Sequence, residues 1–172
     1  MADLEKLPAY GKNGVVHVVI ETPKGSGVKL AYEPQLGTFS IARPLALGVV
    51  YPYDWGFVPS TLADDGDPLD AMVLYDGSTF PGFLLRCRPL GVVRVAEKKK
   101  RNDRVILVPV DYPRCDHLKD VVDLPKRTRQ ELEEFFEIAV TFTGKSLKKL
   151  GWGGAAEAAK VIRNAVKRAK LP

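Results

Sequence analysis

Cysteine and histidine are scarce in this 172-residue sequence, which contains two of each. Cys87 and Cys115 cannot form a disulfide framework or a zinc signature, so two reduced thiols are expected. His17 and His117 lie far apart in the sequence, and no Ser-His-Asp or Cys-His arrangement for nucleophilic catalysis is legible. We therefore interpret the two histidines as structural residues.

Long apolar runs are also missing. The longest apolar stretches are far shorter than the roughly 20 residues that a membrane span requires. Residues 1–5 lack a basic region followed by an apolar one, which is the pattern of a secretory signal. The sequence thus predicts no membrane association and a cytoplasmic location.

The excess of one charge is small. Lys and Arg together number 26 and Asp and Glu 21, which gives a formal net charge of +5. This balance suits an anionic ligand but is too small to indicate nucleic-acid binding. With 45% hydrophobic and 27% charged residues, the composition is that of a folded protein, and the length suits one domain over residues 1–172.

Short apolar segments separated by glycine and proline fill the first two thirds of the sequence. Such segments predict short strands, and strands at this spacing are typical of a barrel or a sandwich. The expected strands are 15–20, 28–32, 38–42, 71–75, 83–88, 91–96 and 104–110.

Apolar residues at helical spacing fill the last third. Asp123 is expected to cap a helix with Pro125 in its first turn, and Gly144 to end it. The apolar face of this helix consists of Leu132, Phe135, Phe136, Ala139 and Val140. A second helix is predicted from about Ala155, with apolar and basic residues on opposite faces. The fold class is therefore α+β and mainly β: a small barrel with two C-terminal helices packed on it.

Four aspartates are crowded into residues 62–70, Leu-Ala-Asp-Asp-Gly-Asp-Pro-Leu-Asp. They are Asp64, Asp65, Asp67 and Asp70. Like charges this close repel one another, and a hard cation such as Mg²⁺ or Mn²⁺, which prefers carboxylate oxygens, offsets the repulsion. A solvated acidic turn is the alternative. An EF-hand is excluded because Leu69 stands where an oxygen ligand is required and no Glu closes the loop.

The motif Asp65-Gly-Asp-Pro-Leu-Asp70 resembles the signature of the soluble family I inorganic pyrophosphatases. Other motifs agree with that family in order and spacing over nearly the whole chain. They are Val-Ile-Glu-Thr-Pro at 19–23, Lys29, Arg43, Tyr51-Pro52, Arg-Cys-Arg-Pro at 86–89, the segment 116–125, Phe135-Phe136-Glu137 and Gly151-Trp152. The resemblance implies a five-stranded OB-like barrel flanked by helices, which agrees with the elements predicted above.

The resemblance also implies an activity, the hydrolysis of inorganic pyrophosphate to two phosphates with Mg²⁺, or with Mn²⁺ or Co²⁺ in its place. It implies Asp65 and Asp70 as ligands of the activating metals and Asp67 as the catalytic base. Glu21 is implied as a ligand of a metal near the leaving phosphate. These assignments predict a reaction in which water attacks phosphorus.

Substrate contacts and assembly follow from the same resemblance. Lys29, Arg43 and Tyr51 are implied as residues that bind the substrate, Arg43 through its forked guanidinium. The family resemblance further implies a homo-oligomer, often a hexamer in bacteria.

Two parts of the chain depart from the family pattern. Glu97 and Asn102 stand where the family has two metal-binding aspartates, and Arg104 replaces a phosphate-binding lysine. Trp55 occupies the place of a phosphate-binding tyrosine, and residues 139–140, Ala-Val, replace a Tyr-Lys pair. We expect Glu97 and Asn102 to remain metal ligands and Arg104 to bind phosphate. The lysines and arginine of 98–101 would partly neutralise charge in a weakened enzyme.

Other functions fit parts of the sequence. One is a paralogue that acts on another phosphoanhydride or phosphate ester, and another is a catalytically dead or binding-only homologue. An OB-like barrel with the basic run 98–101 also suits single-stranded nucleic acid, but the aspartates would repel its phosphates. The loose P-loop match at 139–146 lacks the strand that must precede it.

Overall fold

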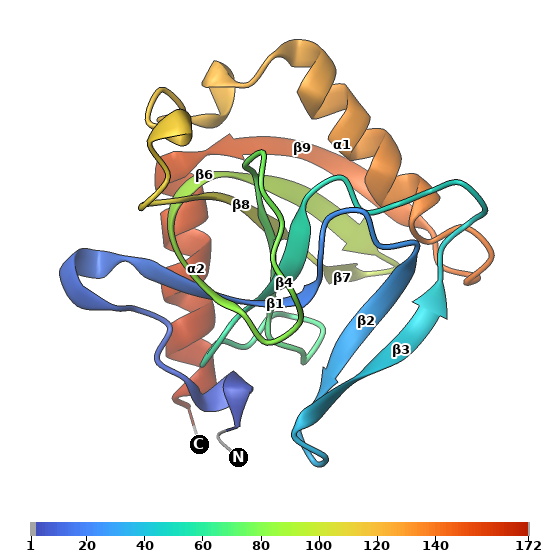
Figure 1. The fold of residues 1–172 in the computed structure, drawn as a ribbon, viewed down its shortest axis with the longest axis horizontal. Coiled ribbons are helices and arrows are strands. Elements are labelled where there is room, and N and C mark those ends of the chain that lie inside the picture. The colour runs from blue at the N-terminus through green and yellow to red at the C-terminus, as the bar shows by residue number, and fades with distance from the viewer. Residues whose placement is uncertain (1–2, 172) are drawn as a thin grey trace.

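The computed structural model describes residues 3–171, which form a closed sheet, a separate hairpin and two α-helices (Figure 1). The strands are β1 Val16–Thr22, β2 Val28–Glu33, β3 Thr38–Pro44, β4 Asp54–Val58, β5 Leu69–Val73, β6 Leu84–Glu97, β7 Lys100–Arg101, β8 Arg104–Pro109 and β9 Leu147–Gly154. The helices are α1 Lys126–Ile138 and α2 Ala155–Ala169, and short 3-10 helices span Leu4–Lys6, Lys12–Gly14, Pro113–Cys115 and Val121–Asp123.

Five strands close into a ring. The sheet runs in the order β1-β4-β5-β8-β6, and β6 also pairs with β1. The pairing of β5 with β8 is parallel, whereas the other pairings of the ring are antiparallel. Closure of this kind leaves the ring without free edges. The predicted five-stranded OB-like barrel with two helices is therefore confirmed.

Apolar residues alternate between two cores, as the period of a β-strand requires. In β8, Val105 and Leu107 pack in one core with the inner face of α2, whose buried residues are Ala158, Ile162 and Ala165. Ile106 and Val108 pack in the other core with α1. The barrel wall thus has apolar contacts on both faces, and each helix covers one of them.

The strand predictions were incomplete in two places. The segments predicted as 83–88 and 91–96 form the single strand β6, which continues through Pro89 with a register shift against β8 between Pro89 and Gly91. β4 and β9 were not predicted. β4 is buried at every position and so lacks alternation, and β9 contains glycines that disfavour a strand locally but pairs with β6 along its length.

The first helix differs from the prediction at both ends. Asp123 belongs to the preceding 3-10 helix, where its carboxylate accepts hydrogen bonds from the N–H groups of Lys119 and Asp120, and Pro125 is the N-cap of α1. The helix ends at Ile138 rather than continuing to Gly144. The chain then turns through 139–144, and this turn directs the Ala139 carbonyl toward Arg43.

The second helix begins at Ala155 as predicted, with Gly154 as its N-cap. Glycine has no side chain that can accept from the first helical N–H groups. Asp120, distant in sequence, supplies this acceptor: its Oδ2 receives a hydrogen bond from the Ala155 N–H at 2.7 Å. Neither α-helix, nor any shorter helix within residues 3–171, has the length and apolar character of a membrane span. Cys87 and Cys115 are buried free thiols, as predicted.

Candidate active site

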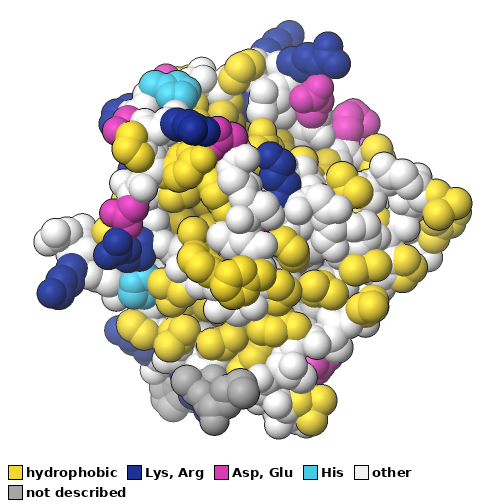
Figure 2. Space-filling view, in the orientation of Figure 1, with side chains coloured by type: hydrophobic (Ala, Val, Ile, Leu, Met, Phe, Trp, Pro, Cys, Tyr) yellow, Lys and Arg dark blue, Asp and Glu magenta, His cyan; other side chains and the backbone are white. Residues whose placement is uncertain are grey.

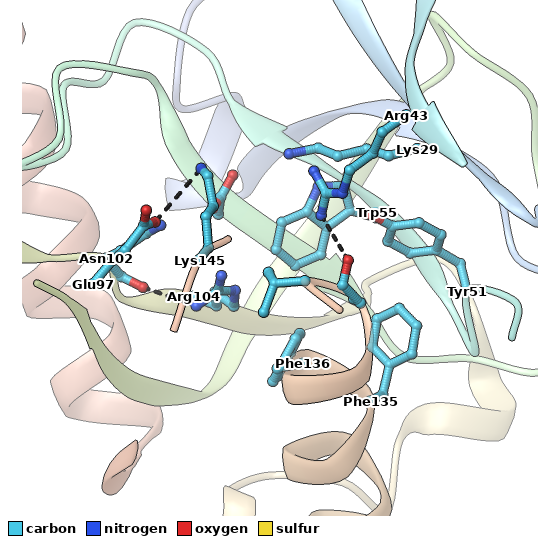
Figure 3. A pocket seen from close by; sticks show the side chains of 13 residues that line it. Lys29, Arg43, Tyr51, Trp55, Glu97, Asn102, Arg104, Phe135, Phe136 and Lys145 are labelled. Carbon is cyan, nitrogen blue, oxygen red and sulfur yellow. Dashed lines mark hydrogen bonds and ion pairs between the residues drawn. The ribbon is translucent and has the colours of Figure 1, made fainter. Parts of the chain in front are cut away.

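A pocket opens on one side of the barrel, between the β2–β3 hairpin, the acidic loop, the β6–β7 hairpin and the end of α1 (Figure 3). Its inner part is lined by Lys29, Arg43, Tyr51, Trp55, Asp70, Glu97, Asn102, Arg104, Phe135, Phe136, Ala139, Val140 and Lys145. Its outer part is lined by Lys29, Asp65, Asp67, Asp70, Lys98, Lys99, Lys100, Glu97, Asn102 and Lys145. All the predicted site residues except Glu21 therefore line one opening.

The acidic loop separates its four aspartates. Asp65 and Asp67 are exposed at the outer part of the pocket, where Asp65 Oδ1 accepts a hydrogen bond from the Asp67 N–H at 3.2 Å. Asp70 lies within β5 and reaches the inner part. Asp64 does not line the pocket, and it is ion-paired with Arg168 of α2. Three of the four carboxylates thus face the same space.

Asp70 is the most perturbed of these carboxylates. Burial raises its pKa above the usual range, and the nearby charges of Asp65 and Asp67 raise it further. Arg104 and Lys29 oppose this shift because positive charge favours the carboxylate. The site therefore concentrates negative charge in a place that is poorly solvated, and a bound cation would relieve it.

Glu21 lies behind the pocket wall at the end of β1. Its Oε1 accepts a hydrogen bond from the Tyr32 N–H at 2.8 Å. Burial raises its pKa from 4.5 to about 7, and the charge of Asp70 adds to the shift while Lys29 opposes it. Glu21 is therefore close enough to two pocket residues to share their electrostatic field, although it does not line the pocket itself.

The pKa of Glu21 predicts how the stability of the metal-free protein depends on pH. Between 4.5 and about 7, the native state holds a proton that the unfolded chain has released, so stability falls as pH rises through this window. The slope from one group is at most about 1.4 kcal/mol per pH unit. In a chelator, Glu21→Gln should flatten the fall in melting temperature between pH 5 and 8. An unchanged slope would contradict this assignment.

Two arginines form the cationic wall opposite the aspartates. Arg104 is only 7% exposed, and its guanidinium lies 5.1 Å from the Phe136 ring centroid and 5.8 Å from that of Trp55. Burial lowers its pKa, and the charge of Asp70 counteracts this. The half-buried Arg43 donates from Nη2 to the Ala139 carbonyl at 2.9 Å. The aromatic faces and the carbonyl hold both guanidinium groups at the pocket.

Buried donors without partners gather at the same place. Within residues 3–171, the buried side-chain nitrogens that lack a hydrogen-bond partner are Nε of Arg43, Arg94, Arg104 and Arg129 and Nε1 of Trp55. Arg43, Trp55 and Arg104 all line the inner pocket. Because unpaired buried donors are rare and costly in folded proteins, three in one pocket indicate a ligand rich in acceptors.

The β6–β7 hairpin brings Glu97 and Asn102 to the pocket. Glu97 pairs with Lys100 across the turn, and Asn102 follows directly after β7. Asp103 does not line the pocket and instead binds Arg101, at 3.0 and 2.8 Å. As the alternation of side chains predicted, Asn102 and not Asp103 faces the site.

Lys145 was missed as a site residue by sequence reasoning. It stands in the loop between α1 and β9, and its Nζ lies 3.6 Å from Glu97 Oε2 (Figure 3). Only the Gly144-Lys145-Ser146 sequence marked it, as part of the rejected P-loop match. Phe135 and Phe136 also line the pocket, although the sequence assigned them to the core alone.

The donor set of the pocket suits a hard divalent cation. The carboxylates of Asp65, Asp67, Asp70 and Glu97 and the amide of Asn102 offer only oxygen ligands toward it, and oxygen ligands suit Mg²⁺ and Mn²⁺. As the side chains stand, no group of three or more Asp, Glu, His or Cys within residues 3–171 is arranged to hold one ion. Carboxylates that repel one another are expected to draw together only around a cation.

Comparison with known proteins places the chain. The family model described as inorganic pyrophosphatase matches residues 18–170. The inorganic pyrophosphatase of Thermus thermophilus is 40% identical over 174 residues, which is 99% of each chain, and that of Synechocystis is 38% identical over 168 residues, which is 98% of this chain and 99% of the relative. The chain therefore belongs to the inorganic pyrophosphatase family.

Solved structures agree with this assignment. A crystal structure of an inorganic pyrophosphatase from Thermus thermophilus superposes with a TM-score of 0.93 at 39% identity, and the match covers 99% of this chain and all of the other. An inorganic pyrophosphatase from Helicobacter pylori gives a TM-score of 0.88 at 32% identity, with 96% of this chain and 99% of the other covered. The predicted resemblance is thus confirmed by both sequence and fold.

Proposed function

We propose that this protein hydrolyses inorganic pyrophosphate to two phosphates in the cytoplasm, with a divalent cation, Mg²⁺ in the first place and Mn²⁺ or Co²⁺ as substitutes. The observation that carries the proposal is the division of one pocket into two sides. Carboxylates line one side, and on the other lie buried arginines with unpaired donors. Such a pocket suits an anion that arrives together with cations.

The carboxylate side would hold the metal and accept the proton. Asp65 and Asp70 are the main proposed ligands, with Glu97 and Asn102 on the opposite hairpin and Glu21 behind them. A divalent ion bound there lowers the pKa of water and neutralises phosphate charge. Asp67 is exposed at the outer pocket. Its carboxylate is therefore free to take the proton of the attacking water.

The cationic side would bind and orient the substrate. Lys29 and Arg43 would hold phosphate oxygens at one end and Arg104 from the pocket floor, where burial strengthens each charged hydrogen bond. Tyr51 is 3% exposed, and burial raises the pKa of its hydroxyl, so the hydroxyl stays protonated and can donate. Lys145 at the rim adds a further cation.

Pyrophosphate is favoured over the other candidate functions. The relatives that match over nearly the full chain carry the name of inorganic pyrophosphatase, and the acidic loop is intact in this sequence. A nucleic-acid-binding surface is not favoured, because Asp65, Asp67 and Asp70 line the outer pocket beside the lysines of 98–100 and would repel a phosphate backbone without metal.

The proposal is tested by phosphate release. The purified protein should release phosphate fastest from pyrophosphate with Mg²⁺, more slowly from tripolyphosphate and nucleotides, and from none of them in excess chelator. The same panel should be run with Mn²⁺ and Co²⁺. If pyrophosphate is not hydrolysed with any of the three cations, the proposed function is wrong.

Assembly remains part of the proposal. Figure 2 shows apolar side chains spread across the face seen there. Large apolar residues that are strongly exposed in the single chain include Leu47, Phe80 and Phe142. Exposed apolar side chains suit contacts between copies of a chain. We propose a homo-oligomer, a hexamer by family resemblance, whose mass light scattering would measure.

A further inference from the structure

Trp55 is a buried donor with no acceptor. Its side chain is 4% exposed and lines the inner pocket, and its Nε1 has no hydrogen-bond partner. The indole N–H can only donate, so neither a lysine nor an arginine nearby can satisfy it. A buried donor left unpaired costs the folded protein free energy, which a suitable acceptor would return on binding.

The second tryptophan of the chain shows what an ordinary indole does. Trp152 Nε1 donates to Glu133 Oε1 at 2.7 Å. The unpaired state is therefore particular to Trp55 and to its position in the pocket. It calls for an explanation in the pocket itself rather than in the general behaviour of tryptophan in this fold.

The surroundings of Trp55 define the acceptor. Arg104 lies 5.8 Å from the indole centroid, and Figure 3 shows Arg43 and Lys29 beside the same ring. The Nε atoms of Arg43 and Arg104 are unpaired as well. An acceptor for all three donors must be anionic and must present several oxygens, and a phosphate group meets both requirements.

Access to these donors depends on the pocket rim. The three nitrogens are closed to solvent, so a ligand reaches them only if rim side chains move. Arg43 donates to the Ala139 carbonyl at 2.9 Å, and it can exchange this acceptor for a ligand oxygen. Lys145, with 51% of its side chain exposed, can also give way.

We propose that the Trp55 indole N–H donates a hydrogen bond to a phosphate oxygen of the bound ligand, between the guanidinium groups of Arg43 and Arg104. Trp55 is then a substrate-binding residue that carries no charge. The inference rests on the proposed function and deepens it, because it names a neutral donor among the cations that bind the substrate.

The indole N–H signals test this contact directly. In protein labelled with ¹⁵N at the indole nitrogens, titration with inorganic phosphate at fixed Mg²⁺ should move the Trp55 signal downfield until it saturates. The Trp152 signal should stay in place because its donor is already bound to Glu133. The variant Trp152→Phe assigns the two signals.

A matched pair of variants gives the energetic test. Trp55→Phe keeps an aromatic ring and removes the donor, so the dissociation constant for phosphate should rise about tenfold, the value of one hydrogen bond to a charged acceptor. KM for pyrophosphate should rise with it, and kcat should change less. Trp152→Phe should leave phosphate affinity within about twofold.

The two readouts separate the inference from the function on which it rests. If other signals of the pocket saturate with phosphate while the Trp55 indole does not move, the inference is wrong and the proposed function stands. If no signal moves at all, the inference also falls, and the phosphate-release assay decides whether the proposed function falls with it.

Discussion

Replacing Asp67 by asparagine should abolish most of the pyrophosphatase activity. The substitution keeps the size of the side chain and removes the group that accepts a proton. General-base catalysis is typically worth about 10²- to 10⁴-fold, so kcat should fall by that factor while the melting temperature stays close to that of the parent protein. Initial rates of phosphate release at saturating Mg²⁺ and pyrophosphate measure it.

Asp64→Asn is the matched control for this prediction. Asp64 belongs to the same loop and carries the same charge, but it pairs with Arg168 and does not line the pocket. Its loss should leave kcat within about twofold, because exposed ion pairs contribute little. Equal activity of Asp67→Asn and the parent protein would show that Asp67 is not the base.

Replacing Arg104 by methionine should produce the second large effect. The methionine side chain can fill the space against Trp55 and Phe136, but it offers neither charge nor donors to a phosphate. Loss of one preorganised donor to developing charge costs about 10²- to 10³-fold. We therefore expect kcat/KM for pyrophosphate to fall by about 10²-fold, and Arg104→Lys, which keeps the charge, to recover part of this loss.

The control for Arg104 lies in the same hairpin. Arg101 is exposed, is ion-paired with Asp103 at 2.8 Å and does not line the pocket. Arg101→Met makes the same chemical change and should leave kcat/KM within about twofold. Circular dichroism and melting temperature should accompany both variants. A folded Arg104→Met protein with normal kcat/KM would remove Arg104 from the substrate site.

The part of the site that could be predicted from sequence is the part encoded by neighbouring residues. Asp65, Asp67 and Asp70 lie in one short loop, and Glu97 and Asn102 flank one short turn, so local geometry brings each set together. The structure places both sets on the same pocket. Glu21 was predicted with them, but it lies behind the wall, and its role as a ligand stays a prediction.

The parts that could not be predicted depend on distant contacts. β9 contains three glycines and two lysines, a composition that opposes a strand, and it forms because β6 offers a long edge. Lys145 reaches the pocket because α1 ends at Ile138 and the following loop folds back. The unpaired Trp55 N–H depends on the complete packing around it, and no sequence pattern reports such an absence.

The length of β6 has a consequence for how this protein can change. Its 14 residues pair with β1, β8 and β9 and extend beyond the barrel into the hairpin with β7. The tip at 98–101 is exposed apart from its ladder bonds, yet Lys98, Lys99 and Lys100 face the pocket. Mutations there can alter the electrostatic potential of the pocket without disturbing the packed interior. Evolution can therefore adjust ligand preference at this tip at little cost in folding stability.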